Sequence, residues 1–331
     1  MADVELRQVT KTFGKEIGID AVSLKINNGE FVVLLGPTGA GKTTTLRCIA
    51  GLEKPDSGEI LIDGVNVIDD SPAQRDVAMV FQQYSLYPHL SVRENLEFPL
   101  KSPILKTPVD IMNKKVNEVA EVLRISHKLD NKATELSGGE MQRVSMGRAL
   151  VRNPRIYLMD EPLSSLDAKL RGDLRIELKR IQSELGATML YVTHDQTEAM
   201  TMATQIGVLN NGRIEQFGTP RDIYENPSSQ YVATRLGSPR INTLPISIFG
   251  GAPIGASLIG LRPEHIELGG GQDCEVTRIE HLGDQTRLHL RLGDHHLITL
   301  TDSHTPIKVG AVIGITPKNP IFFDANGARV V

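Results

Sequence analysis

The sequence has 331 residues, of which 36 are Lys or Arg and 40 are Asp or Glu, so the formal net charge at pH 7 is −4. This length favours two domains, and the slightly acidic charge gives no electrostatic reason to expect nucleic acid as the main partner. Only two cysteines occur, Cys48 and Cys274, without a CxxC pair. They argue against a disulfide framework or a cysteine zinc site and favour a reducing compartment.

The N-terminus, MADVELRQVTKTFG, lacks the basic and then apolar pattern of a signal peptide. The longest apolar runs are far shorter than the roughly 18 residues that a membrane-spanning helix needs. We therefore expect a soluble, cytoplasmic protein. Any membrane spans that it works with must belong to another subunit.

The first 50 residues predict an α/β domain with a parallel sheet. VELRQV and AVSLKI alternate between apolar and polar residues and predict short strands, whereas FVVLL (31–35) is a continuous apolar run ending in glycine. Such a run is typical of a strand buried on both faces. The segment 43–50 predicts a helix directly after a glycine-rich loop. Strand, loop and helix in this order indicate an α/β arrangement.

The loop before this helix matches the phosphate-binding pattern G-x-x-x-x-G-K-[ST]. Its glycines allow several backbone N–H groups to point at phosphates, and the helix N-terminus adds its positive dipole end. A lysine that reaches the β- and γ-phosphates and a hydroxyl that can ligate Mg²⁺ complete the pattern. The candidate nucleotide-binding residues here are Gly36, Pro37, Thr38, Gly39, Ala40, Gly41, Lys42, Thr43 and Thr44.

The middle of the chain predicts a helical insert followed by two more buried strands. Apolar residues at helical spacing occur within 88–135, and IYLMDE (156–161) and MLYVTH (189–194) read as strands. An amphipathic helix lies between these strands and ends at Gly186, and 205–218 predicts a hairpin.

The composition changes after residue 235. The segment 236–245 is rich in Gly, Pro and Asn and predicts a linker. Beyond it, short alternating runs such as CEVTRIEHL, TRLHLRL and HLITLT predict a small antiparallel barrel or sandwich. His295 and His296 are adjacent and would point to opposite faces of a strand, so a solvated hairpin is favoured over a metal site.

Two acidic residues, Asp160 and Glu161, close the second buried strand. Beside a phosphate-binding loop, Asp160 is placed to hold Mg²⁺ and Glu161 to orient and polarise the attacking water. A GTPase is disfavoured because the nearest match to an Asn-Lys-x-Asp guanine reader, residues 131–134, lacks the Asp.

Several further positions have both a functional and a structural interpretation. Ser137 to Glu140 form a second glycine-rich helix start suited to a phosphate, which is also an N-cap with Glu140 as its capping-box partner. His194 could bond a γ-phosphate, although a single histidine at a strand end is more often structural. Gln82 could reach Mg²⁺ or water, and Phe13 could stack on adenine or belong to the core.

In this order, these segments resemble the ATPase family of ABC transporters. The order is Phe13-Gly14, the phosphate-binding loop, FQQY at 81–84, LSGGE at 136–140, LMDEP at 158–162, SSLD at 164–167 and THD at 193–195. This set covers residues 1–235. YPHLSVRENLEFPL (87–100), VTHDQTEAM (192–200), GLRPEHIEL (260–268) and the β-rich tail are similar to carbohydrate-importer ATPases of the maltose and glycerol-phosphate class.

The resemblance implies that ATP and Mg²⁺ are the cofactors. It assigns the adenine to Phe13 and the metal to Thr43, Gln82 and Asp160. It makes Glu161 the general base, with His194 stabilising the transition state beside it. Gln82 is then expected to sense Mg²⁺ and water and to couple the site to a permease.

It further implies contacts in trans within a homodimer. Ser137, Gly138, Gly139 and Glu140 are expected to meet the ATP that the other copy holds, and Asp167 lies in a loop that crosses between subunits. Glu140 stands where the family more often has Gln, and its extra negative charge is expected to weaken nucleotide affinity. The loop GPTGAGKT also differs conservatively from the commoner GPSGCGKS.

The implied architecture is an ABC ATP-binding domain (1–235) with an antiparallel β subdomain and a helical subdomain at about 88–150, a linker (236–245) and an OB-like domain (246–331). The implied function is ATP hydrolysis that drives uptake of a sugar or sugar-like solute. Two permease subunits and an extracytoplasmic solute-binding protein are the expected partners, at the inner face of the membrane. The alternative is a non-transport ABC ATPase acting on ribosomes or DNA, which usually has two nucleotide domains in one chain.

Overall fold

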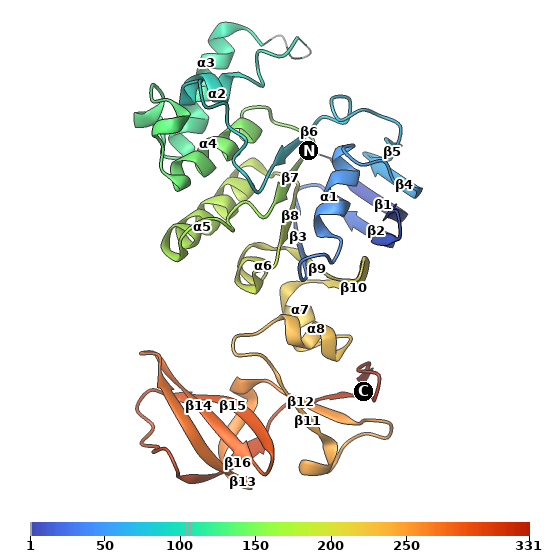
Figure 1. Cartoon of the computed structure of the whole chain (residues 1–331), viewed down its shortest axis with the longest axis vertical. Coiled ribbons are helices and arrows are strands. Elements are labelled where there is room, and N and C mark those ends of the chain that lie inside the picture. Colours follow the sequence, from blue (N-terminus) through green and yellow to red (C-terminus); the bar gives the residue numbers. More distant parts are fainter. Residues whose placement is uncertain (1, 104, 106) are drawn as a thin grey trace. The chain divides into compact units, whose positions relative to one another are not determined.

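The computed structural model describes residues 2–103, 105 and 107–331 and contains two compact units, Met1–Pro220 and Arg221–Val331. Figure 1 shows both units along the chain. The first is an α/β unit and the second is mainly β, which confirms the predicted fold class. Among the described residues, no helix is long and apolar enough to cross a membrane.

A six-stranded sheet lies at the centre of the N-terminal unit, in the order β10-β9-β3-β8-β7-β6. All neighbours pair in parallel except the edge hairpin of β9 and β10. The three predicted buried strands, β3, β7 and β8, lie side by side in it, and every residue in them is buried. The strands are β3 (Phe31–Leu35), β6 (Val77–Val80), β7 (Ile156–Asp160), β8 (Met189–Thr193), β9 (Gln205–Asn210) and β10 (Arg213–Gly218).

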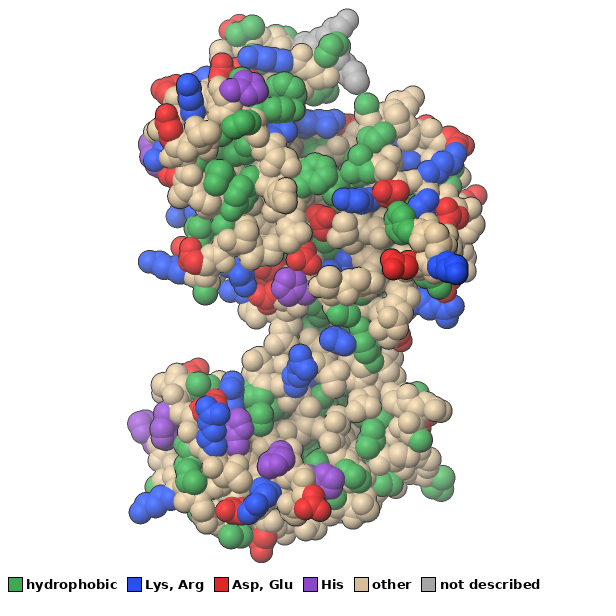
Figure 2. All heavy atoms as spheres, in the orientation of Figure 1, with side chains coloured by type: hydrophobic (Ala, Val, Ile, Leu, Met, Phe, Trp, Pro, Cys, Tyr) green, Lys and Arg blue, Asp and Glu red, His purple; other side chains and the backbone are tan. Residues whose placement is uncertain are grey.

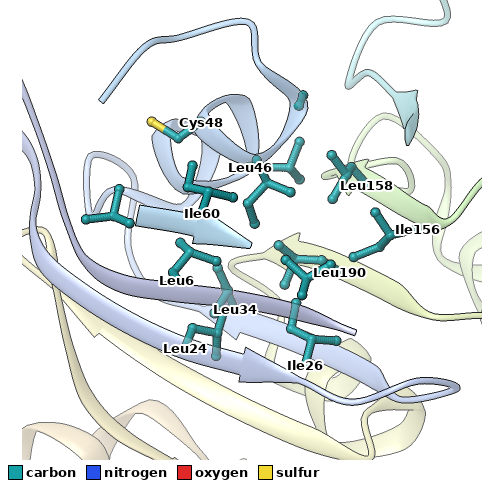
Figure 3. Close-up of a cluster of buried hydrophobic side chains, with 14 of the residues drawn as sticks. Leu6, Leu24, Ile26, Leu34, Leu46, Cys48, Ile60, Ile156, Leu158 and Leu190 are labelled. Atoms are coloured by element: carbon teal, nitrogen blue, oxygen red, sulfur yellow. The ribbon is translucent and has the colours of Figure 1, made fainter. Parts of the chain in front are cut away.

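A second, antiparallel sheet in this unit has the order β2-β1-β4-β5 and confirms the predicted β subdomain. Its strands are β1 (Val4–Phe13), β2 (Glu16–Ile26), β4 (Ser57–Ile62) and β5 (Val65–Asn66). Alternate side chains of these strands pack against α1 (Lys42–Ala50) and the central sheet. Figure 3 shows this core, in which the labelled buried side chains are Leu6, Leu24, Ile26, Leu34, Leu46, Cys48, Ile60, Ile156, Leu158 and Leu190.

The predicted helical insert is present, and Figure 1 shows α2, α3 and α4 grouped together. Capping-box hydrogen bonds start α2 at Ser91 and α4 at Ser137, and Gly186 ends α5 in the left-handed conformation as predicted. The helices are α2 (Val92–Glu97), α3 (Val109–Val122), α4 (Gly138–Leu150), α5 (Ala168–Leu185) and α6 (Gln196–Met202), with short 3-10 turns at Ser126–Lys128 and Ala133–Glu135.

The C-terminal unit contains two four-stranded sheets, in the orders β11-β12-β17-β18 and β15-β14-β13-β16. Leu288 and Leu290 of β14 are fully buried while Arg291 is exposed, so the predicted alternation is confirmed. The strands are β11 (Asn242–Pro245), β12 (Leu258–Leu261), β13 (Ile266–His281), β14 (Gln285–Leu292), β15 (His295–Asp302), β16 (Val312–Pro317), β17 (Ile321–Phe323) and β18 (Arg329–Val330).

The segment between the predicted domains is more structured than its composition suggests. The helices α7 (Pro220–Glu225) and α8 (Gln230–Arg235) precede it, and the second compact unit already begins at Arg221, within α7. The last four residues of the predicted linker form β11, where the Asn242 amide bonds the carbonyls of Leu261 and Ile298. A strand pattern this short and interrupted by proline does not stand out in the sequence.

A buried arginine closes the C-terminal end of α1. Arg75 is 2% exposed, and its guanidinium donates to the carbonyls of Cys48 and Ile49 at that helix end and to those of Ile68 and Asp70. A cation at this position satisfies helix carbonyls that have no intrahelical partner and complements the helix dipole.

We therefore expect Arg75→Ala to lower the free energy of unfolding of the N-terminal unit by about 2–4 kcal/mol, because several buried carbonyls would lose their donors. Urea denaturation followed by far-UV circular dichroism measures this change. Lys54→Ala is the matched control, since Lys54 forms only an exposed pair with Asp69. Equal midpoints for the two variants would contradict this account of Arg75.

Candidate active site

The loop between β3 and α1 has the backbone that phosphate binding requires. Gly39 and Gly41 have positive φ angles of 81° and 102°, which other residues rarely adopt. A Cβ atom on Gly41 would also lie 2.4 Å from the Gly18 carbonyl oxygen, so close packing excludes any side chain there. The loop is therefore fixed as a turn that leads straight into the N-terminus of α1.

Lys42 is the first residue of α1, and its side chain folds back over this loop. Its ammonium donates to the carbonyls of Gly36 and Pro37, both at 2.9 Å, and lies 3.7 Å from a carboxylate oxygen of Glu161. Burial lowers the pKa of Lys42, and the charges of Glu161 and Asp160 oppose this shift. A buried cation held by neutral carbonyls and one carboxylate favours the approach of an anion.

Thr43 and Asp160 form the next contact of the site. The Thr43 hydroxyl donates to an Asp160 carboxylate oxygen at 2.8 Å, across the loop from the end of β7. Burial raises the pKa of Asp160, while the hydrogen bond from Thr43 partly offsets this rise. The pair places two oxygen ligands of the type that Mg²⁺ prefers next to the phosphate-binding loop.

Glu161 follows β7 with a positive φ of 44°, an unusual conformation for a residue with a side chain. This turn directs its carboxylate toward Lys42 and also toward His194, whose Nδ1 lies 3.1 Å from the second carboxylate oxygen. His194 follows β8, and its side chain is 58% exposed. One carboxylate thus connects the buried lysine with an accessible imidazole.

Lys42, Thr43 and Glu161 line a cavity of about 360 Å³, whereas Asp160 and His194 contact these residues without lining it. Phe13 and Gln82 also line it, and Phe13 is 45% exposed. The cavity further includes Glu16, Ile17 and Gly18, which the sequence interpretation missed. Phe13 pairs with Glu16 across the β1–β2 hairpin, and this pairing places Glu16 and the two residues after it at the cavity. Only the register of the hairpin could have predicted their position. The predicted residues that line it are Phe13, Thr38, Gly39, Gly41, Lys42, Thr43, Thr44, Gln82 and Glu161.

The segment Ser137–Glu140 is not part of this cavity's lining. Ser137 caps α4, and Glu140 accepts hydrogen bonds from the Ser137 N–H (2.8 Å) and hydroxyl (2.9 Å). Gly139 has no room for a side chain, because an added Cβ would lie 2.1 Å from Leu170 of α5. The capping interpretation is therefore correct.

The loop that follows Glu161 is held by its own hydrogen bonds. Asp167 caps α5 by accepting from the Leu170 N–H at 3.0 Å, and it does not line the cavity. The Ser164 hydroxyl donates to the Glu161 carbonyl, while Ser165 lies 3.2 Å from the Tyr84 hydroxyl. The segments that contain Gln82 and Asp167 are thus in direct contact through Tyr84.

Two family models match the chain. One, described as "ABC transporter", covers residues 19–164, and another, described as "TOBE domain", covers residues 259–319. The chain is 43% identical to the sn-glycerol-3-phosphate import ATP-binding protein of Psychromonas ingrahamii, over 99% of this chain and 95% of that protein. It is 42% identical to the maltose/maltodextrin import ATP-binding protein of Salmonella typhimurium, over 99% and 97%.

Solved structures of ABC transporter cassettes are also similar to this chain. A nucleotide-free ATP-binding cassette from an ABC transporter is similar with a TM-score of 0.63 and 28% identity, covering 71% of this chain and 98% of that chain. A dimeric bacterial ABC transporter cassette has a TM-score of 0.59 and 36% identity, covering 66% and 99%.

The fold and the phosphate-binding loop define a P-loop ATPase. The chain belongs to the ABC transporter family, as an ATP-binding and ATP-hydrolysing subunit with a C-terminal TOBE domain. The resemblance stated from the motifs is confirmed.

Lys42→Met should raise the Kd for ATP by roughly 100-fold, because it removes about two charge-assisted hydrogen bonds to phosphate. Titration of the full chain with a fluorescent ATP analogue measures this change. Lys25→Met, at an exposed position of β2, is the matched control and should leave the Kd unchanged. An unaltered Kd for Lys42→Met would mean that the phosphates bind elsewhere.

Proposed function

We propose that this chain drives the uptake of a sugar or sugar-like solute by binding and hydrolysing ATP in a homodimer. The observation that carries the proposal is the convergence of Lys42, Thr43, Gln82 and Glu161 on one cavity beside Phe13. Adenine stacks on the exposed Phe13 ring, and the phosphates lie over the loop and the N-terminus of α1.

Glu161 acts as the general base in the hydrolysis step. Its carboxylate accepts a proton from the water that attacks the γ-phosphorus, and the bond from this phosphorus to the β–γ bridging oxygen breaks, so that ADP leaves. Lys42 moves from Glu161 to the phosphate oxygens. His194, 3.1 Å from Glu161, stabilises the transition state and keeps the carboxylate oriented. Gln82, which also lines the cavity, contacts the water.

The residues present suit Mg²⁺ bound together with ATP. No group of three or more His, Cys, Asp and Glu side chains that could hold a metal by itself occurs in the described part of the chain. Thr43 and Asp160 supply a hydroxyl and a carboxylate oxygen, and Gln82 an amide oxygen, which leaves further positions for phosphate oxygens and water. Bound there, Mg²⁺ neutralises charge on the β- and γ-phosphates.

In this proposal ATP drives the closure of two copies, and α4 of each copy contacts the ATP of the other. The N–H groups of Gly138 and Gly139 begin α4 outside the lining of their own chain's cavity, and we assign them, together with the Ser137 hydroxyl, to the γ-phosphate held by the other copy. Asp167 lies in the segment that crosses between the copies. The dimeric structure of one similar ABC transporter cassette supports this arrangement, and release of phosphate reopens the dimer.

The partners are two permease subunits, with an extracytoplasmic solute-binding protein acting through them, and the chain lies at the inner face of the membrane. The names of the two import ATP-binding relatives support this assignment and give no support to a ribosome or DNA function. Figure 2 shows acidic and basic side chains mixed over the face in view.

We expect Glu161→Gln to bind ATP but to hydrolyse it at least about 100-fold more slowly, because the amide cannot accept the proton. The variant should accumulate as an ATP-dependent dimer in analytical ultracentrifugation. Glu184→Gln, at an exposed position of α5, serves as the control. Hydrolysis by Glu161→Gln near the parent rate would show that another group is the base.

Importer function is tested by purifying the tagged chain from native membranes in mild detergent. Mass spectrometry should then identify two integral-membrane proteins, with or without a solute-binding protein. Recovery only from the soluble fraction, with ribosomal or DNA-repair proteins, would contradict the role in transport. It would not affect the assignment as an ATPase.

A further inference from the structure

The N-terminal end of α4 contains a carboxylate with three close partners. Glu140 accepts the Ser137 N–H and the Ser137 hydroxyl at one oxygen, and Lys128 lies 3.2 Å from the other. The side chains of Lys128 and Glu140 are 29% and 25% exposed. Lys128 ends the 3-10 turn Ser126–Lys128, which lies between α3 and α4 in the chain.

A negative charge at this place opposes the proposed role of the helix end. The positive end of the α4 dipole would favour a phosphate, but Glu140 already occupies that field with its own charge. A second anion brought to the same N–H groups is repelled by the carboxylate across a partly dehydrated interface. A neutral side chain at position 140 would cause no such repulsion.

The Ser137 hydroxyl raises a related problem, because it has a single proton. In the structure it donates that proton to Glu140, so it can donate to a phosphate only after this bond is released. Release is easier when the carboxylate keeps other donors. Lys128 at one oxygen and the Ser137 N–H at the other provide them.

We propose that Lys128 is a positioning residue that neutralises Glu140 and so keeps the Ser137 end of α4 competent to bind the γ-phosphate held by the other copy. This inference rests on the proposed contact in trans. It assigns to Lys128 no contact with the ATP of its own chain, whose cavity Lys128 does not line.

According to the proposal, Lys128 promotes ATP-driven dimerisation only because the side chain at position 140 is negatively charged. Its removal should therefore be harmful with Glu140 and nearly harmless with Gln at that position. Such non-additivity is the expected signature of two side chains acting as a pair, and a merely structural role of Lys128 does not produce it.

The test is a double-mutant cycle in the full-length Glu161→Gln background, which separates ATP-driven association from turnover. Ultracentrifugation over a range of ATP concentrations gives the concentration at half-maximal dimer for the parent, Lys128→Ala, Glu140→Gln and the double variant. Lys114→Ala is the control for loss of one lysine, since Lys114 pairs with Glu118 on the exposed side of α3.

We expect Lys128→Ala to raise this concentration about fivefold or more, and the double variant to match Glu140→Gln within about twofold. Lys114→Ala and Lys128→Arg should behave like the parent. The Kd for ATP of the isolated monomer should not change, and the defect should shrink in high salt because the repulsion is screened.

The proposal is overturned if Lys128→Ala behaves like Lys114→Ala, or if its defect persists in the double variant. If circular dichroism shows that Lys128→Ala is unfolded, Lys128→Gln is tested in its place, because it keeps most of the aliphatic part of the side chain. Failure of the Glu161→Gln parent to associate with ATP refutes the trans dimer and this role together, whereas the other outcomes concern Lys128 alone.

Discussion

The parallel register of β3, β7 and β8 is the constraint on which the site depends. Leu35 pairs with Thr193, and Asp160 pairs with Val192, so the three strands end at the same edge of the sheet. Residues that follow these strands are far apart in sequence but meet within a few ångströms. The active site of this ATPase is therefore a consequence of strand register more than of any single loop.

The charged groups at that edge have partners within the chain. Lys42 is buried against carbonyls and one carboxylate, and Asp160 keeps the hydrogen bond from Thr43. Burial acts in opposite directions on the two groups, lowering the pKa of Lys42 and raising that of Asp160. Binding of Mg-ATP would replace these internal contacts with stronger ones to phosphate, so nucleotide and protein compete for the same charges.

Hydrogen bonds to a carboxylate also shape the N-terminal end of α4. The capping box at Ser137 stabilises the start of α4, and this helix end does not line the cavity beside the phosphate-binding loop. Close packing of Gly139 on Leu170 and the contact of Tyr84 with Ser165 connect this helix end with α5 and with the Gln82 segment. Structural and functional interpretations of these residues are thus compatible.

The sequence by itself determined the phosphate-binding loop, the buried strands, the carboxylates at Asp160 and Glu161 and the family, because these depend on local patterns and fixed spacings. It also raised Phe13 and Gln82 as candidates, and the resemblance then gave them their roles. Tertiary structure alone decided that Glu16 and Ile17 line the cavity and that β11 replaces part of a linker. It alone paired Lys128 with Glu140, because strand register and contacts between distant segments leave no local periodicity to read.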